Sequence, residues 1–134
     1  MITATARRRS GHTHDVEVSG HKLVVDEPIE EGGSNLGPSP TRLLAASLAS
    51  CTAMTVEMYA DRKEWELAEL EVSAEFEPGP RGECDHFTVT MRLPPGLSED
   101  QMERIRIIAG KCPVHRTLAS EAEIEIEDRI EVLG

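Results

Sequence analysis

The longest stretch without glycine or proline constrains the fold more than any other part of the chain. It covers residues 41–64, with the sequence TRLLAASLASCTAMTVEMYADRKE. Its first half is apolar or small on every side, which is typical of a helix that is buried all round. At about 100° per residue, one line along this helix carries Leu44, Leu48, Cys51, Thr55 and Met58. The sequence therefore predicts a buried helix with a thiol among apolar side chains.

Two interpretations of Cys51 remain open at this point. A free cysteine is most often an inert, small apolar side chain in a core. Alternatively, the thiol reacts, in which case other residues of the chain must activate it. The neighbours of Cys51 between residues 45 and 53 are mostly Ala, Ser and Thr, so another backbone can approach this part of the helix closely.

Length and composition limit the classes of protein to which the chain can belong. At 134 residues we expect a single domain, 1–134, with a core of its own. A net charge of −11 argues against binding to nucleic acid or to an anionic membrane, since both need a basic surface. No export signal is visible at the start, and polar residues interrupt the apolar helix, so we expect no membrane span and a cytoplasmic location.

Alternation of apolar and polar residues predicts strands in two groups. The first group precedes the long helix, and a loop rich in glycine and proline, Pro28–Pro40, connects this group to the helix. The second group follows the helix and forms an antiparallel pair. The predicted strands are Ile2–Arg8, His14–Ser19, Lys22–Asp26, Glu69–Glu77 and Phe87–Leu93.

The last part of the chain predicts a second helix, a short third one and a final strand. Ser98–Gln101 is a capping box, and Gly110 ends the helix that it begins. Alternation predicts the final strand at Glu123–Val132. The resulting order, βββ-α-ββ-α(α)-β with antiparallel sheets, is typical of the α+β class.

A second cysteine, Cys112, lies where the short third helix should begin. Pro113 follows it, and proline is favoured at the first position of a helix. Unpaired backbone N–H groups at a helix start, together with the adjacent Lys111, stabilise a thiolate. To form a disulfide with Cys51, the fold must bring the two Cα atoms within about 7 Å of each other.

Two segments resemble those of a known family. GPSPTRLLAASLASCTAMTVEMYADRKEW resembles the cysteine-bearing central helix of the OsmC/Ohr family, and KCPVHRTL resembles its second-cysteine segment. The order of strands and helices fits along the entire chain. CPVHRTL together with SCTAMT and MYADRK is more similar to the OsmC-like branch than to the organic hydroperoxide reductases. The resemblance implies an intertwined homodimer with sites at the subunit interface and the two central helices buried in the middle.

The resemblance also implies a thiol-dependent peroxidase for organic hydroperoxides, in oxidative stress defence. Cys51 would attack the peroxide and become a sulfenic acid, and Cys112 would form a disulfide with it. An external dithiol would then reduce this disulfide, so neither a cofactor nor a metal is expected. Apolar surroundings suit an organic substrate. The residues expected to bind it are Leu44, Leu48, Thr55 and Met58.

One feature departs from the reductases of the family. Those enzymes hold the thiolate with a carboxylate at the start of the long helix and an arginine from the preceding loop. Here the corresponding helix positions are Thr41 and Arg42, and the loop contains no arginine. Glu30, Glu31 or an arginine of the first strand could replace the pair, and the sequence does not distinguish them. Without a cation, apolar surroundings raise the pKa of a thiol and slow its reactions.

The alternative function is therefore a non-catalytic OsmC-like dimer that binds a small apolar ligand or senses oxidant. A zinc site is not expected, because neither Cys84 with His86 nor Cys112 with His115 has the spacing of a structural zinc site. Cys84 lies next to the turn between the two later strands, and we interpret it as an exposed thiol without a role.

Overall fold

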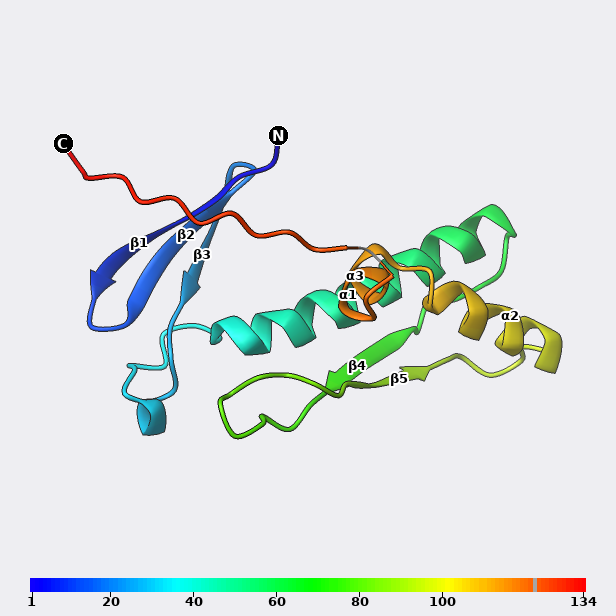
Figure 1. Cartoon of the computed structure of the whole chain (residues 1–134). Helices are drawn as coiled ribbons and strands as arrows, with labels where there is room; N and C mark the ends of the chain where they lie inside the picture. The colour runs from blue at the N-terminus through cyan, green and yellow to red at the C-terminus, as the bar shows by residue number, and fades with distance from the viewer. Residues whose placement is uncertain (122) are drawn as a thin grey trace. The chain divides into compact units, whose positions relative to one another are not determined.

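The computed structural model describes residues 1–121 and 123–134 and confirms the predicted α+β class (Figure 1). Two compact units divide the chain. The first is Met1–Ser47 with Ala74–Val89, and the second is Leu48–Ser73 with Thr90–Gly134. The elements, in chain order, are β1 (Ala4–Ser10), β2 (Thr13–Val18), β3 (His21–Val25), a short 3-10 helix η1 (Ile29–Glu31), α1 (Pro40–Arg62), β4 (Glu71–Glu75), β5 (Thr88–Arg92), α2 (Glu99–Ala109) and α3 (Pro113–Leu118).

An antiparallel sheet in the order β1-β2-β3 dominates the first unit. Val16 of β2 pairs with Ala6 on one side and with Leu23 on the other. The turn between β2 and β3 has positive φ at both Ser19 (49°) and Gly20 (82°), which is the backbone that a two-residue hairpin needs. The three strands predicted before the long helix are therefore present, and their ends shift by only one or two residues.

Asp26, directly after β3, holds the loop that leads to α1. Its side chain is buried, and its carboxylate accepts hydrogen bonds from Thr13 Oγ1 (2.8 Å) and from the amides of Glu27 (2.8 Å), Ser34 (3.2 Å) and Leu36 (3.3 Å). Burial alone would raise the pKa of Asp26, but these hydrogen bonds outweigh it and hold the pKa below its ordinary value. The loop is thus an ordered structure built around one carboxylate.

Two glycines of this loop are required because the backbone comes very close to the end of β3 and to the residue after Asp26. A Cβ atom at Gly33 would collide with the backbone of Glu27, and one at Gly37 with the carbonyl of Val24. No side chain fits at either position without moving the main chain.

Helix α1 begins at Pro40 and ends at Arg62, within two residues of the expected 41–64, but it is not buried all round. A single stripe at every fourth position is covered, comprising Leu48, Thr52, Val56 and Ala60. Leu44, Met54 and Met58 remain 40%, 56% and 62% exposed. The prediction of complete burial is wrong for the single chain, because the single chain covers only one side of the helix.

By length and composition alone, α1 could cross a membrane, with a mean hydropathy of 1.3 in its most apolar window. The polar residues of the helix therefore do not exclude a span by this criterion, contrary to the sequence-based expectation. A core helix of a globular protein meets the same criterion. Val56 of α1 is fully buried against Ile105 and Ala109 of α2, which is the packing of a core helix.

The second unit has its core between α1 and α2. Trp65, Leu67, Leu70, Met91, Leu93 and Leu97 pack around the central cluster of Val56, Ile105 and Ala109. The capping box at the start of α2 is formed as predicted, since Gln101 N donates to Ser98 Oγ (3.1 Å) and Ser98 N donates to Gln101 Oε1 (2.8 Å). This cap fixes where α2 begins and so aims Ile105 at the core.

The final strand predicted at Glu123–Val132 is not formed in the single chain. Residues 123–134 have no regular secondary structure, and Figure 1 shows them as an extended coil. Every large apolar side chain of this segment is exposed, namely Ile124, Ile126, Ile130, Val132 and Leu133. A strand exists only where a neighbouring strand pairs with its backbone, so alternation of side chains is not sufficient to form one.

Candidate redox site

The second unit brings the two predicted redox cysteines together. Cys51 lies near the middle of α1 and is half-buried, whereas Cys112 precedes α3 and is 0% exposed. Thr52, next to Cys51 on α1, donates a hydrogen bond from Oγ1 to Cys112 Sγ over 3.9 Å. Cys112 is near enough to Cys51 to raise the pKa of its thiol through hydrogen bonding and charge, and neither cysteine forms a disulfide. The contact between α1 and the start of α3 thus brings together two cysteines that are 61 positions apart in the sequence.

The first turn of α3 supplies backbone donors to both sulfur atoms. Cys112 is the N-cap residue, as predicted, with Pro113 at the first helical position. Its Sγ accepts a hydrogen bond from the amide of His115 at 3.2 Å. The amide of Val114 donates to the Cys51 sulfur. Amides at the start of a helix have no partner within the helix, so they are free to bind the two sulfurs.

The environment of Cys51 raises the pKa of its thiol and so disfavours the thiolate. Burial is the largest cause that raises the pKa of Cys51, and the neighbouring Cys112 thiol raises it further. The Val114 amide and the Thr55 side chain, which also hydrogen-bonds this sulfur, oppose the shift without cancelling it. None of these groups carries a positive charge.

We therefore expect Cys51 to react slowly with iodoacetamide at neutral pH and faster as the pH rises. Its pKa lies above the ordinary value of 9.0, so at pH 7 the thiolate is scarcer than in a free cysteine, and the alkylation rate should still be increasing beyond pH 9.0. Peptide mass spectrometry after timed alkylation measures this rate. Cys112→Ser removes one cause of the shift and should move the profile of Cys51 to lower pH. A Cys51 rate that is already constant at pH 6 would contradict this account.

The four predicted substrate-binding residues do not share one environment. Thr55 is half-buried and in contact with the Cys51 sulfur. Leu48 is only 3% exposed and belongs to the buried stripe of α1. Leu44, in the first unit, and Met58, in the second, are largely exposed. The role of these residues in substrate binding stays a prediction, and Thr55 is the one that touches the thiol.

Three of the arginines near the start of the chain, Arg8, Arg9 and Arg42, have partners within the first unit. Arg9 of β1 forms an ion pair with Asp15 of β2. Arg8 Nε donates to a backbone carbonyl at 2.9 Å, and Arg42 donates to Ser39 Oγ at 3.1 Å. These contacts account for the side chains locally and do not identify a cation for the thiolate.

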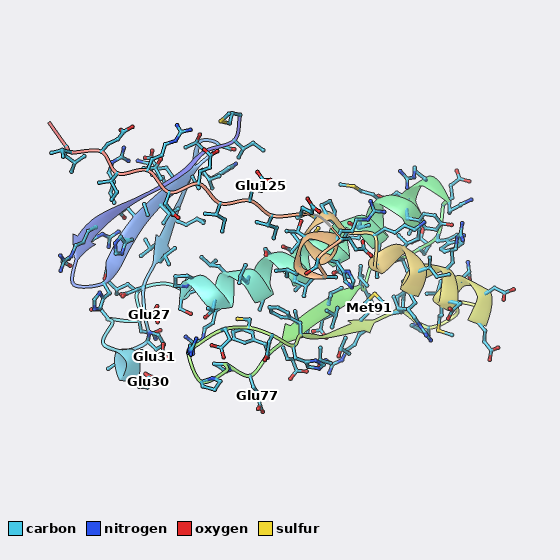
Figure 2. The ribbon with its side chains drawn as sticks, viewed as in Figure 1. Glu27, Glu30, Glu31, Glu77, Met91 and Glu125 are labelled. Atoms are coloured by element: carbon cyan, nitrogen blue, oxygen red, sulfur yellow. The ribbon has the colours of Figure 1, made fainter. Side chains whose placement is uncertain are left out.

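A carboxyl pair and a cavity in the first unit were not predicted from the sequence. Glu27 and Glu31, on the loop after β3 (Figure 2), hydrogen-bond each other, which is the largest cause of a raised pKa at Glu27. Both carboxyls line a cavity of about 570 Å³. Its apolar wall comes from the sheet and the start of α1, namely Ala6, Val16, Val25, Pro40 and Leu43. The period-2 spacing of the strand residues was the only sequence signal for this wall.

Metal-ligating residues do not gather anywhere in the described part of the chain. No group of three or more His, Cys, Asp or Glu side chains could hold an ion among residues 1–121 and 123–134. Cys84 is half-buried in the loop between β4 and β5 rather than exposed as predicted.

A family model described as "OsmC-like protein" matches residues 32–127, which include both cysteines of the site. The chain belongs to the OsmC-like family. The match includes α1 and α3, the two helices that carry the thiols. No curated protein sequence matches this OsmC-like chain.

Solved structures of family members share the fold of this OsmC-like protein. An osmotic stress induced and detoxification response protein of Psychrobacter arcticus 273-4 has a TM-score of 0.75 at 23% identity, covering 87% of this chain and 88% of its own. The organic hydroperoxide resistance protein OsmC of Legionella pneumophila has a TM-score of 0.61 at 24% identity, with 88% of both chains covered. An organic hydroperoxide resistance protein of Vibrio cholerae, with captopril bound in one of its active sites, has a TM-score of 0.64 at 23% identity, covering 88% of this chain and 83% of its own.

Proposed function

We propose that this protein is a thiol-dependent peroxidase that reduces organic hydroperoxides. The contact between the Cys51 and Cys112 thiols carries the proposal. The Cys51 thiolate attacks the outer oxygen of the hydroperoxide, an alcohol leaves, and the sulfur becomes a sulfenic acid. Cys112 then attacks this sulfur, so that a disulfide forms and water leaves. An external dithiol reduces the disulfide and completes the cycle.

The substrate class and the location of the protein are part of the same proposal. Two structural relatives are named organic hydroperoxide resistance proteins, and the half-buried setting of Cys51 favours a substrate with an apolar tail. The cycle consumes dithiol in every turnover. We place the protein in the cytoplasm because dithiol reductants are maintained there.

A homodimer is also proposed, on the basis of apolar surface that the single chain leaves in water. Leu44, Met54 and Met58 of α1 are exposed, and so are the isoleucines between residues 124 and 130. Exposed apolar surface that is not scattered but follows one element is typical of an interface. Analytical ultracentrifugation distinguishes this dimer from a monomer, which would contradict the proposal.

A turnover assay tests the peroxidase directly. Reduced protein with cumene hydroperoxide and dithiothreitol should consume the peroxide faster than free cysteine at the same thiol concentration. Without dithiothreitol, one equivalent of peroxide should leave a Cys51–Cys112 disulfide, detected as a cross-linked peptide by mass spectrometry. Consumption no faster than that by free cysteine would refute the proposal.

A non-catalytic, ligand-binding dimer is the second candidate. Two observations favour it, the raised pKa of Cys51 and the apolar cavity of about 570 Å³ in the first unit. A cavity of this volume accommodates a small organic molecule. This candidate predicts an apolar ligand that copurifies with the protein, seen by native mass spectrometry, and no turnover of peroxide.

A further inference from the structure

His115 carries the buried polar atom that lacks a partner in the described part of the chain. Its Nδ1 is buried and makes no hydrogen bond there, and no other buried side-chain nitrogen or oxygen among the described residues is in that situation. Buried polar groups are nearly always hydrogen-bonded, and a native exception calls for a physical explanation. His115 is the third residue of α3, and its backbone amide donates to Cys112 Sγ.

The His115 backbone limits how far the unpartnered nitrogen can lie from the Cys112 sulfur. The amide nitrogen of His115 is 3.2 Å from Cys112 Sγ. Four covalent bonds separate this amide from Nδ1, so the two nitrogens are at most about 5 Å apart, and Nδ1 lies within about 8 Å of the sulfur. Proton transfer needs the two atoms about 3 Å apart or joined by one bridging water, and rotation about the two side-chain bonds of His115 changes their distance within this limit.

The needs of Cys112 and His115 are complementary. Cys112 Sγ is fully buried and already accepts hydrogen bonds from Thr52 Oγ1 and from the His115 amide. As a thiol it still has a proton to donate, and this proton must leave before Cys112 can act as a nucleophile. A neutral imidazole whose proton is on Nε2 offers a lone pair at Nδ1. The imidazole of His115 lacks a hydrogen-bond donor, and the amide of the same residue binds the Cys112 thiol, which must lose a proton.

We propose that His115 carries the proton of Cys112 in the second step of the peroxidase cycle. The inference rests on the proposed function. Nδ1 takes the proton from the Cys112 thiol, and the resulting thiolate attacks the sulfur of the Cys51 sulfenic acid. The S–S bond forms as the S–O bond breaks, and the imidazolium returns the proton to the leaving hydroxide. The products are the disulfide, water and a neutral imidazole, so the step needs no further reactant.

Two substitutions separate proton transfer from a structural role. His115→Asn keeps a hydrogen-bonding atom near the position of Nδ1 but cannot accept a proton at neutral pH. His115→Ala removes the ring and leaves space for free imidazole. General acid–base catalysis typically contributes about 100-fold or more, so both variants should form the disulfide about 100-fold more slowly than the wild type. Millimolar imidazole should restore part of the rate to His115→Ala alone.

The two steps are measured separately with one equivalent of cumene hydroperoxide and no reductant. Peroxide consumption reports sulfenic acid formation and should be unchanged within about twofold in both variants, because Nδ1 acts only in the second step. Trapping with dimedone should show sulfenic acid that persists in the variants and not in the wild type. His21→Asn, an exposed histidine at the start of β3, is the matched control and should behave as the wild type.

Each outcome decides the inference. Disulfide formation at the wild-type rate in His115→Asn would overturn it, because a hydrogen bond would then be sufficient. A slow His115→Ala that imidazole does not accelerate would also overturn it and indicate a packing role for the ring. If the wild type forms no sulfenic acid, the proposed function fails and this step fails with it. If the wild type forms sulfenic acid and all variants close the disulfide equally fast, only the role of His115 fails.

Discussion

Replacing Cys51 with serine will reduce the turnover of organic hydroperoxides to the uncatalysed background. The first step transfers an oxygen atom from the peroxide to sulfur, which becomes a sulfenic acid. A serine hydroxyl has no corresponding oxidised form, so it cannot accept the oxygen. The substitution only replaces one sulfur atom with oxygen at a half-buried position, so α1 and its contact with α3 should persist. Peroxide consumption at saturating dithiol, together with a circular dichroism spectrum, tests this expectation.

The other two cysteines serve as matched controls for this experiment. Cys84→Ser changes a thiol outside the redox site, in the loop between β4 and β5, and should leave turnover unchanged. Cys112→Ser should retain a first, single oxidation and then stop at the sulfenic acid, because the resolving thiol is missing. Equal turnover by Cys51→Ser and the wild type would assign the chemistry to another residue and refute the proposed mechanism.

Replacing Ile105 with alanine will destabilise the protein by roughly 3 kcal/mol, the usual cost of emptying such a site in a core. Ile105 is 0% exposed, and it packs with Val56 and Ala109 between α1 and α2. The loss consists of the transfer free energy of three carbons and of the cavity that they leave behind. For a chain of this length, the Tm should fall by about 10 °C. Urea unfolding followed by circular dichroism measures the change in the free energy of unfolding.

Ile107 is the matched control on the same helix. Its side chain is 44% exposed, so Ile107→Ala should cost less than about 1 kcal/mol. The two substitutions remove the same atoms and change helix propensity equally, so their difference isolates burial. Similar losses at both positions would contradict the assignment of Ile105 to the core.

Much of the fold follows from local sequence, because its causes are local. The capping box at Ser98 and the N-cap position of Cys112 form through contacts within four residues. The hairpins of the first sheet depend on turns whose residues tolerate positive φ, such as Gly20. Neighbours along the chain decide each of these features, and the structure agrees with the prediction at both helix starts.

The candidate site was predictable in part. The sequence pointed to Cys51 and Cys112 by residue type and by the helix start at Pro113. It did not reveal that Thr52 binds the second sulfur or that Nδ1 of His115 lacks a partner. Hydrogen bonds between α1 and α3 depend on the angle and the distance between the two helices. The spacing of residues along either helix does not determine this angle or distance.

By itself, then, the amino-acid order determined the helices, the first five strands, the helix starts at Ser98 and Cys112 and the identity of the thiols. Tertiary structure alone decided which side of α1 is covered, that Asp26 organises the loop after β3, and that two sulfurs 61 positions apart share one set of backbone donors. It also left Glu123–Val132 unpaired, although its alternation is that of a strand. The physical reason is that helix caps and tight turns are satisfied by neighbours in sequence, whereas burial, strand pairing and the pKa of a thiol depend on groups that only folding brings near.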